Sequence, residues 1–148
     1  MAETLGSLCD KLTIVKLKQY HCDDSGKAER LNLQEKQLAV EIDVFVSDAV
    51  DGRIPVERLR FDANKVYKKT GNELQPVPEN SIAAAFAELA KVNCDLWHEQ
   101  EKVYDFEAVP VEEKNTVVKQ LALLNLRRNQ CIDSIDKIFS KTVGKEGE

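Results

Sequence analysis

Polar residues interrupt several apolar helical patterns in this sequence, and they are the first candidates for chemistry. Arg128 falls within an apolar seam that repeats every three or four residues over 121–139. A charged group in such a seam must be paired or must bind something, because burying it alone is costly. An arginine beside carboxylates can bind phosphate or carboxylate groups, with the acids as general bases. The candidate layer comprises Asp10, Lys11, Glu35, Asn125 and Arg128.

A second candidate group is consecutive in the sequence: Trp97, His98 and Glu99. Asp95 and His98 have the spacing of one half of a di-iron motif, whereas a bundle site of that kind needs two such motifs and further carboxylates. Because only one half is present, we expect neither a metal nor a cofactor. The simplest interpretation of Trp97 is an anchor in the core or in an interface.

Apolar periodicity predicts the elements that must position these residues: four helices, at about 3–20, 27–50, 81–104 and 111–140. Short turns make the first two helices one antiparallel hairpin and the last two another. The expected fold is therefore an all-α, antiparallel four-helix bundle of two hairpins, in a single domain of residues 1–148. Residues 51–80 form the long crossover, with a short extra helix near 58–69, and 141–148 are expected as a frayed tail.

Helix geometry separates the two groups of candidates. If the third and fourth helices fold back near Ala108, Glu99 is level with Val117, and at ~1.5 Å per residue that is roughly 16 Å from Arg128. Arg128 should instead be level with Glu88. The Trp97 group and the Arg128 layer are therefore expected to be two features.

The two hairpins also share a weak internal repeat. Leu31-Asn32-Leu33 aligns with Leu124-Asn125-Leu126, and on this alignment Glu35 is equivalent to Arg128. Opposite charges at equivalent core positions would suit a central ion pair. The crossover is locally basic, which fits either a solvated surface or a flap over an anion.

Composition limits the classes of function. The chain has 148 residues, a net charge of −5, 43% hydrophobic and 32% charged residues, which is typical of a soluble helical protein and disfavours nucleic-acid binding. It contains no apolar run of the ~20 residues that cross a membrane, and its opening residues are unlike a signal peptide. The four cysteines form no CxxC pair, so we expect reduced thiols and a cytoplasmic protein.

Two stretches of the chain resemble a family of uncharacterised bacterial proteins of unknown function. They are Asn93-Cys94-Asp95-Leu96-Trp97-His98-Glu99-Gln100-Glu101-Lys102 and Leu124-Asn125-x-x-Arg128-Asn129. Asp10-Lys11-Leu12-Thr13-Ile14 also resembles the opening of related bacterial proteins, some of them associated with cell-surface polysaccharide genes. The sequence departs from the family at Gln100-Glu101, where the family has two acids, and at Val103-Tyr104, where Ala-Arg is usual. The resemblance implies a helical, bacterial, cytoplasmic protein and supplies no activity, but it singles out Trp97, His98, Glu99, Asn125 and Arg128.

Two functions remain open on the sequence. The first is a non-enzymatic interaction protein that binds a helical partner or itself, as a homodimer for example, with a structural polar layer. The second is a binder of, or enzyme acting on, an anionic small molecule in a polar pocket around Arg128. The expected ligand-binding set is Asp10, Lys11, Glu35, Trp97, His98, Glu99, Asn125 and Arg128. A sealed and fully paired Arg128 would favour the first function, and an open cleft at Arg128 the second.

Overall fold

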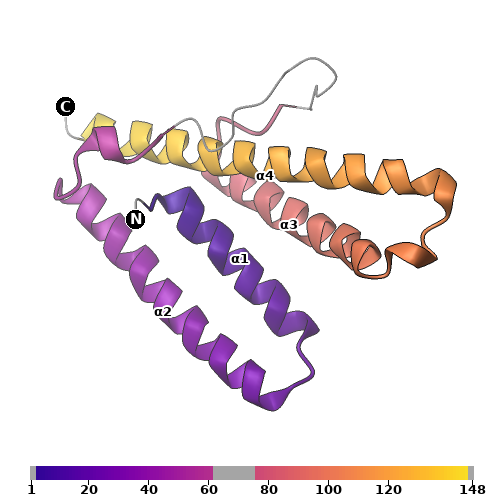
Figure 1. Ribbon diagram of the computed structural model, residues 1–148. Coiled ribbons are helices and arrows are strands. Elements are labelled where there is room, and N and C mark those ends of the chain that lie inside the picture. Colours follow the sequence, from indigo (N-terminus) through magenta and orange to yellow (C-terminus); the bar gives the residue numbers. More distant parts are fainter. Residues whose placement is uncertain (1–2, 62–75, 147–148) are drawn as a thin grey trace.

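The predicted architecture is confirmed by a computed structural model that describes residues 3–61 and 76–146. Four α-helices form two hairpins, α1–α2 and α3–α4, joined by the long crossover (Figure 1). No strand occurs in the described residues. Two short 3₁₀ turns, η1 and η2, lie in the crossover and between α3 and α4. The bounds are α1 Leu5–His21, α2 Ser25–Val50, η1 Val56–Arg58, α3 Ile82–Tyr104, η2 Phe106–Ala108 and α4 Val111–Glu146.

Helix α1 lies at the centre of the arrangement. It contacts α2 on one side and both α3 and α4 on the other, so the two hairpins meet along α1 and splay apart beyond it (Figure 1). Leu8 and Val15 pack with Leu38 of α2 in a small cluster. Leu5 and Cys9 instead belong to the main core. The broad apolar face of α1 is therefore divided between two neighbours.

The main core fills the space between α3, α4 and the first turns of α1. Ala85 and Leu89 of α3 and Ile135 of α4 have no exposed surface. Small side chains early in α3 allow its backbone to approach α4 closely. The aromatic rings of Phe45 and Phe139, 6.3 Å apart, join the last part of α2 to this core.

Polar side chains fix where the helices begin. The Thr4 hydroxyl accepts from the backbone N–H of Ser7, and the Ser7 hydroxyl accepts from the N–H of Thr4, which forms a capping box for α1. Asp24 accepts from two backbone N–H groups at the start of α2. The Ser81 hydroxyl accepts from the backbone N–H of Ala84 and caps the start of α3.

The last turns of α4 correct one prediction. The sequence favoured a frayed tail from Lys141, but α4 continues to Glu146. Val143 is buried in the main core, and Gly144 lies against Val56 of η1. Leu59, just after η1, is also completely buried. The start of the crossover thus covers the end of α4, which the helical pattern of α4 alone could not indicate.

The predicted helix in the crossover is tested only in part, because the structure describes the crossover up to residue 61 and again from residue 76. The described part contains η1 and an ion pair between Arg53 and Asp48 at 3.4 Å. Most of the expected short helix at 58–69, with Lys65, Lys68 and Lys69, lies outside the described residues.

Candidate functional site

Asp10 and Arg128 form the centre of the polar layer. The Arg128 guanidinium donates two parallel hydrogen bonds to the Asp10 carboxylate, from Nε to Oδ1 at 2.8 Å and from Nη2 to Oδ2 at 2.6 Å. Such a two-point pair is among the stronger polar interactions in proteins. Asp10 is 5% exposed, whereas the Arg128 side chain is 30% exposed. The pair connects α1 to α4 at the inner edge of the core.

Two residues that sequence reasoning did not select complete the layer. The Asn93 side-chain amide donates to Asp10 Oδ1 at 2.9 Å and to the Thr13 hydroxyl at 2.7 Å. The Thr13 hydroxyl in turn donates to the backbone carbonyl of Asp10 at 2.7 Å. Asn93 and Thr13 are both buried. The polar layer of Asp10, Thr13, Asn93 and Arg128 therefore joins α1, α3 and α4.

The electrostatics of the layer follow from this pairing. Hydrogen bonding to Asp10 raises the pKa of Arg128 further, although burial opposes the shift. Burial raises the pKa of the neighbouring Cys9 thiol to about 11, with the charges of Asp136 and Asp10 adding to the effect. Cys9 is therefore a protonated packing residue rather than a nucleophile at neutral pH.

Glu35 does not meet Arg128, which corrects the ion pair suggested by the internal repeat. Its carboxylate accepts from Lys16 at 2.9 Å and from Gln19 at 2.8 Å, both on α1. These hydrogen bonds, from Gln19 first and then from Lys16, lower the pKa of Glu35. The hairpins splay at this level, so α2 carries Glu35 away from α4. Lys11 also lies apart from the layer, in an exposed ion pair with Glu3.

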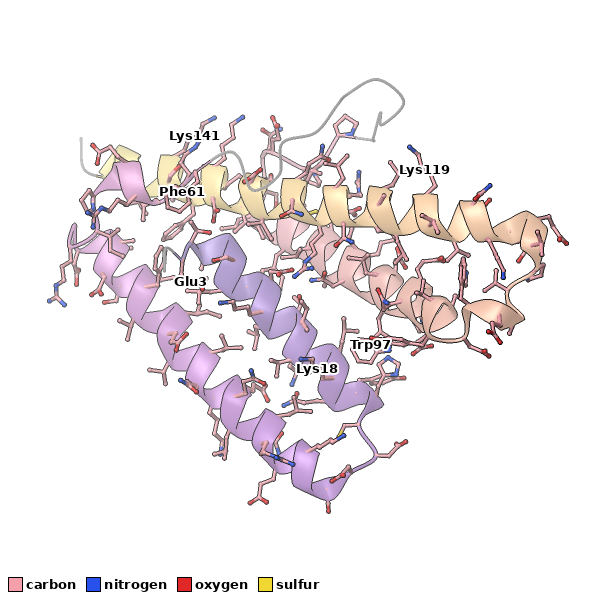
Figure 2. All side chains as sticks on the ribbon, viewed as in Figure 1. Glu3, Lys18, Phe61, Trp97, Lys119 and Lys141 are labelled. Carbon is pink, nitrogen blue, oxygen red and sulfur yellow. The ribbon has the colours of Figure 1, made fainter. Side chains whose placement is uncertain are left out.

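The Trp97 group is a separate feature, as the helix geometry predicted. The Trp97 indole N–H donates to Glu101 at 2.7 Å, and its ring stacks on His21 at 4.7 Å and 9° between planes. His98 meets His21 edge to face at 6.0 Å. Glu99 pairs with Lys102 on its own helix. Figure 2 shows Trp97 and Lys18 close together where the end of α1 approaches α3.

The Asn125 side chain is not part of the polar layer in the described structure. Its backbone carbonyl accepts a hydrogen bond from the Asn129 side chain. The helix geometry placed Glu88 level with Arg128. In the structure Glu88 pairs with the adjacent residue, Arg127, at 2.7 Å. Of the eight predicted site residues, only Asp10 and Arg128 bond to each other in the described structure.

The polar layer is a structural network paired inside the protein, while the Arg128 side chain stays 30% exposed. Both carboxylate oxygens of Asp10 accept hydrogen bonds, and the one shared with Asn93 accepts two. Asp10 is thereby held as an acceptor with little freedom to serve as a general base. Cavities beside Trp97, Pro110 and Val40 do not include Asp10 or Arg128 in their walls.

Within 3–61 and 76–146, no three His, Cys, Asp or Glu side chains gather as a metal site would require. The described helices also lack a segment with the length and apolarity needed to cross a bilayer.

Comparison with known proteins adds no assignment. A scan against protein-family models, a search of curated proteins and a search of solved structures each found no match.

Sequence reasoning also missed a basic cavity between the two hairpins, beside Trp97. Lys27 and Arg30 of α2 line it together with Lys18 of α1. The only signal in the sequence was the absence of acidic residues from the first turn of α2, where acids are usual.

Proposed function

We propose that the protein is a non-enzymatic helical scaffold that self-associates through the outer face of α2. The observation that carries this proposal is an aligned set of exposed apolar side chains on α2. Leu33 is 62% exposed, Val40 61% and Val44 52%. We call these three residues the outer seam.

The spacing of the outer seam indicates a helical partner. Its members are separated by seven and then four residues, the spacing that keeps side chains on one stripe of a helix. At 100° per residue, this stripe points away from Leu38 and Ala49, the two buried residues of α2. Single exposed apolar residues need no explanation, but three on one stripe favour an interaction. The stripe is interrupted by Gln37, and Val40 and Val44 also border a cavity shared with Leu8 of α1.

Charge complementarity favours a second copy of this chain as the partner. Lys36 and Asp43 flank the outer seam on one side, seven residues apart. In an antiparallel pair of α2 helices, a two-fold axis between them brings Lys36 of each copy near Asp43 of the other. The same arrangement places Leu33 opposite Val44 of the second copy. Because a two-fold interface is closed, it gives a dimer rather than a filament.

The absence of salt bridges at Lys36 and Asp43 in the described structure agrees with this arrangement. The pairing of Asp10 with Arg128 inside the protein supports the non-enzymatic part of the proposal. An anionic ligand at Arg128, the alternative function, would have to displace Asp10 from a two-point pair.

The mass of the protein in solution tests the proposal directly. Light scattering coupled to size exclusion, at about 100 μM protein, is expected to give twice the 16.7 kDa chain mass. Val40→Glu is expected to give a monomer with unchanged helix content, because Val40 is 61% exposed and lies outside both core clusters. Val118→Glu, at a similarly exposed valine of α4, is the matched control and should remain a dimer.

A charge exchange tests the antiparallel geometry. Asp43→Lys alone places two lysines together at both ends of the interface and should weaken the dimer about tenfold or more. The double variant Lys36→Asp with Asp43→Lys restores both pairs and should recover most of the affinity. A monomeric wild-type protein, or a dimer that is indifferent to Val40→Glu, would show the proposal to be wrong.

A further inference from the structure

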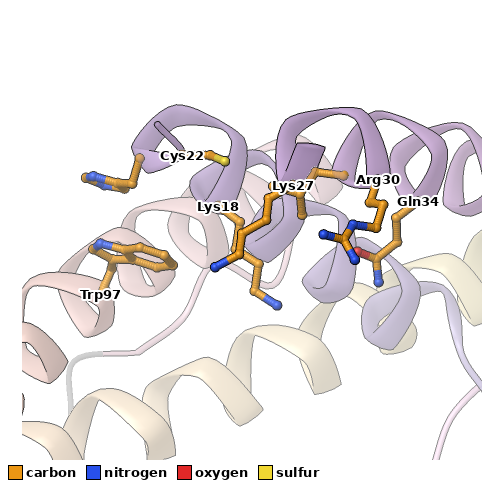
Figure 3. A pocket seen from close by; sticks show the side chains of 8 residues that line it. Lys18, Cys22, Lys27, Arg30, Gln34 and Trp97 are labelled. Carbon is orange, nitrogen blue, oxygen red and sulfur yellow. The ribbon is translucent and has the colours of Figure 1, made fainter. Parts of the chain in front are cut away.

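A second feature of the molecule points to a ligand rather than a protein partner. A cavity of about 550 Å³ lies between the end of α1, the start of α2 and the middle of α3. Figure 3 shows the side chains of Lys18 and Lys27 reaching into the same space, with Arg30 and Gln34 beside them and Trp97 across from them. The cavity lies on a flank of α2 and uses no residue of the outer seam.

The charge of this cavity is one-sided. Its wall contains the cations Lys18, Lys27 and Arg30 and no carboxylate. In the described part of the chain, none of the three forms a salt bridge. Like charges that share one cavity repel each other, and more strongly at a protein surface than in bulk water. An anion between them would remove this repulsion.

Three acids near the cavity are committed to other partners, whereas Asp23 and Glu29, the sequence neighbours of Cys22 and Arg30, are exposed. Asp24 caps the start of α2 by accepting from the N–H groups of Gly26 and Lys27. Glu101 accepts from the Trp97 indole. Glu35, one turn beyond the cavity on α2, accepts from α1.

Helix electrostatics account for Lys18 but not for Lys27. Lys18 and His21 lie in the last turn of α1, where positive charge compensates the helix dipole. Lys27 lies in the first turn of α2, where the dipole makes a cation unfavourable and an anion favourable, and Arg30 follows in the second turn. Their presence there, reaching into a shared space, suits a bound negative group.

The cavity also has apolar lining residues, Trp97 and Leu31. Trp97 is held by its hydrogen bond to Glu101 and by its stacking on His21. Small-molecule sites of this kind typically occupy about 300–1,000 Å³, which is much more than a lone phosphate ion fills. The cavity therefore has room for an uncharged body attached to the anion.

We propose that this cavity binds a small phosphomonoester with a planar or apolar body, of which a mononucleotide is the simplest example. Lys18, Lys27 and Arg30 contact the phosphate, and Trp97 and Leu31 contact the body. Arg30 supplies a planar fork for two phosphate oxygens, whereas the lysines act as point charges.

Trp97 is the only tryptophan in the sequence, so its fluorescence reports on this cavity alone. Titration with adenosine monophosphate, excited where the nucleotide does not absorb, is expected to change the emission in a saturable way. Inorganic phosphate and adenosine are the two partial probes, and each should bind at least about tenfold more weakly than the complete nucleotide. Added salt should weaken the nucleotide binding, because the contacts are between charges.

A double variant and a matched control test whether the nucleotide binds in this cavity. The double variant Lys27→Gln with Arg30→Gln changes two exposed side chains, so the fold should be kept while nucleotide affinity falls about tenfold or more. Lys91→Gln, at an exposed lysine of α3 outside the cavity wall, is the matched control and should bind as the wild type does.

Isothermal calorimetry on the same samples covers the case in which binding does not alter Trp97 emission. Absence of saturable nucleotide binding by both methods, at up to about 5 mM nucleotide, would overturn the proposal. Equal affinity of adenosine and its phosphate, or of inorganic phosphate and the nucleotide, would also overturn it. So would unchanged affinity in the double variant.

Discussion

The backbone amide of Gly6 donates a hydrogen bond to the Asp136 carboxylate at 2.7 Å, across the contact between α1 and α4. Asp136 is 1% exposed, and its negative charge lies at the start of α1, where the helix dipole favours it. A Cβ atom at Gly6 would lie 2.5 Å from the carbonyl oxygen of Ile132 and 2.9 Å from Asp136 Oδ1. Only glycine therefore permits this approach of the two helices.

Gly6→Ala should consequently separate α1 from α4. We expect the free energy of unfolding, measured by urea denaturation, to fall by about 1–3 kcal/mol. Gly144→Ala is the matched control, because the added Cβ there would be 3.8 Å from its nearest neighbour outside its own helix. Since alanine favours a helix over glycine by roughly 0.5–1 kcal/mol, Gly144→Ala should be neutral or stabilising. Equal effects at both glycines would contradict the close approach.

Removal of Arg128 should destabilise the fold because it leaves the buried Asp10 carboxylate without its cation. We expect Arg128→Met to lower the unfolding free energy by about 3 kcal/mol in urea denaturation. Lys16→Met breaks the exposed pair with Glu35 and should cost no more than about 1 kcal/mol.

A double-mutant cycle separates the pair from its surroundings. Asp10→Asn combined with Arg128→Met should cost less than the sum of the two single changes, since no unpaired charge is left. Strictly additive losses would argue against direct coupling between Asp10 and Arg128.

Leu59 provides a test of the contact between the crossover and the core. Leu59→Ala should lower the unfolding free energy by about 2–5 kcal/mol, because Leu59 has no exposed surface. Val56→Ala, three residues earlier and 44% exposed, should cost far less. If thermal or urea unfolding shows equal losses, the crossover does not pack as described.

The cysteines should divide into two pairs by reactivity. Burial raises the pKa of Cys9 and that of Cys131 to about 11, whereas Cys22 and Cys94 are only partly covered. At neutral pH, a thiol-reactive chromophore should therefore label Cys22 and Cys94 first, and should label all four at once only in urea. Four equal labelling rates in the folded protein would contradict this assignment.

The same thiols predict a loss of stability in alkali. The folded state favours the protonated forms of Cys9 and Cys131, so their contribution is complete below the ordinary thiol pKa of about 8.5. It is lost as the pH rises from there towards about 11. Urea midpoints measured across this range should fall, and the fall should be smaller in Cys9→Ala than in the wild type.

Periodicity predicted the helices well because each depends mainly on its own sequence. The Ser81 cap and the turn before Val111 are local signals of this kind. The end of α4 was missed because Val143 and Gly144 are ordered by η1, which comes from a distant part of the chain. Distant contacts of that kind leave little trace in a local pattern.

The polar layer was half predictable for the same reason. Asp10 and Arg128 stood out because each is charged within an apolar pattern, whereas Asn93 and Thr13 are small enough to pass as ordinary members of theirs. Glu35 was misplaced because the internal repeat suggests symmetry between hairpins, while their splay depends on side-chain packing along α1. The angle between the two hairpins cannot be inferred from the residue pattern of a single helix.

The central position of α1 has a consequence for biosynthesis. α1 precedes its α4 partners Ile132, Ile135 and Phe139 by most of the chain. At about 5–20 residues per second, the α1–α2 hairpin would wait roughly 5–20 s on the ribosome with Leu5 and Cys9 uncovered. During that interval the apolar side chains of the nascent chain are exposed to solvent. A ribosome-associated chaperone, or early pairing with another nascent chain, would cover them at this stage.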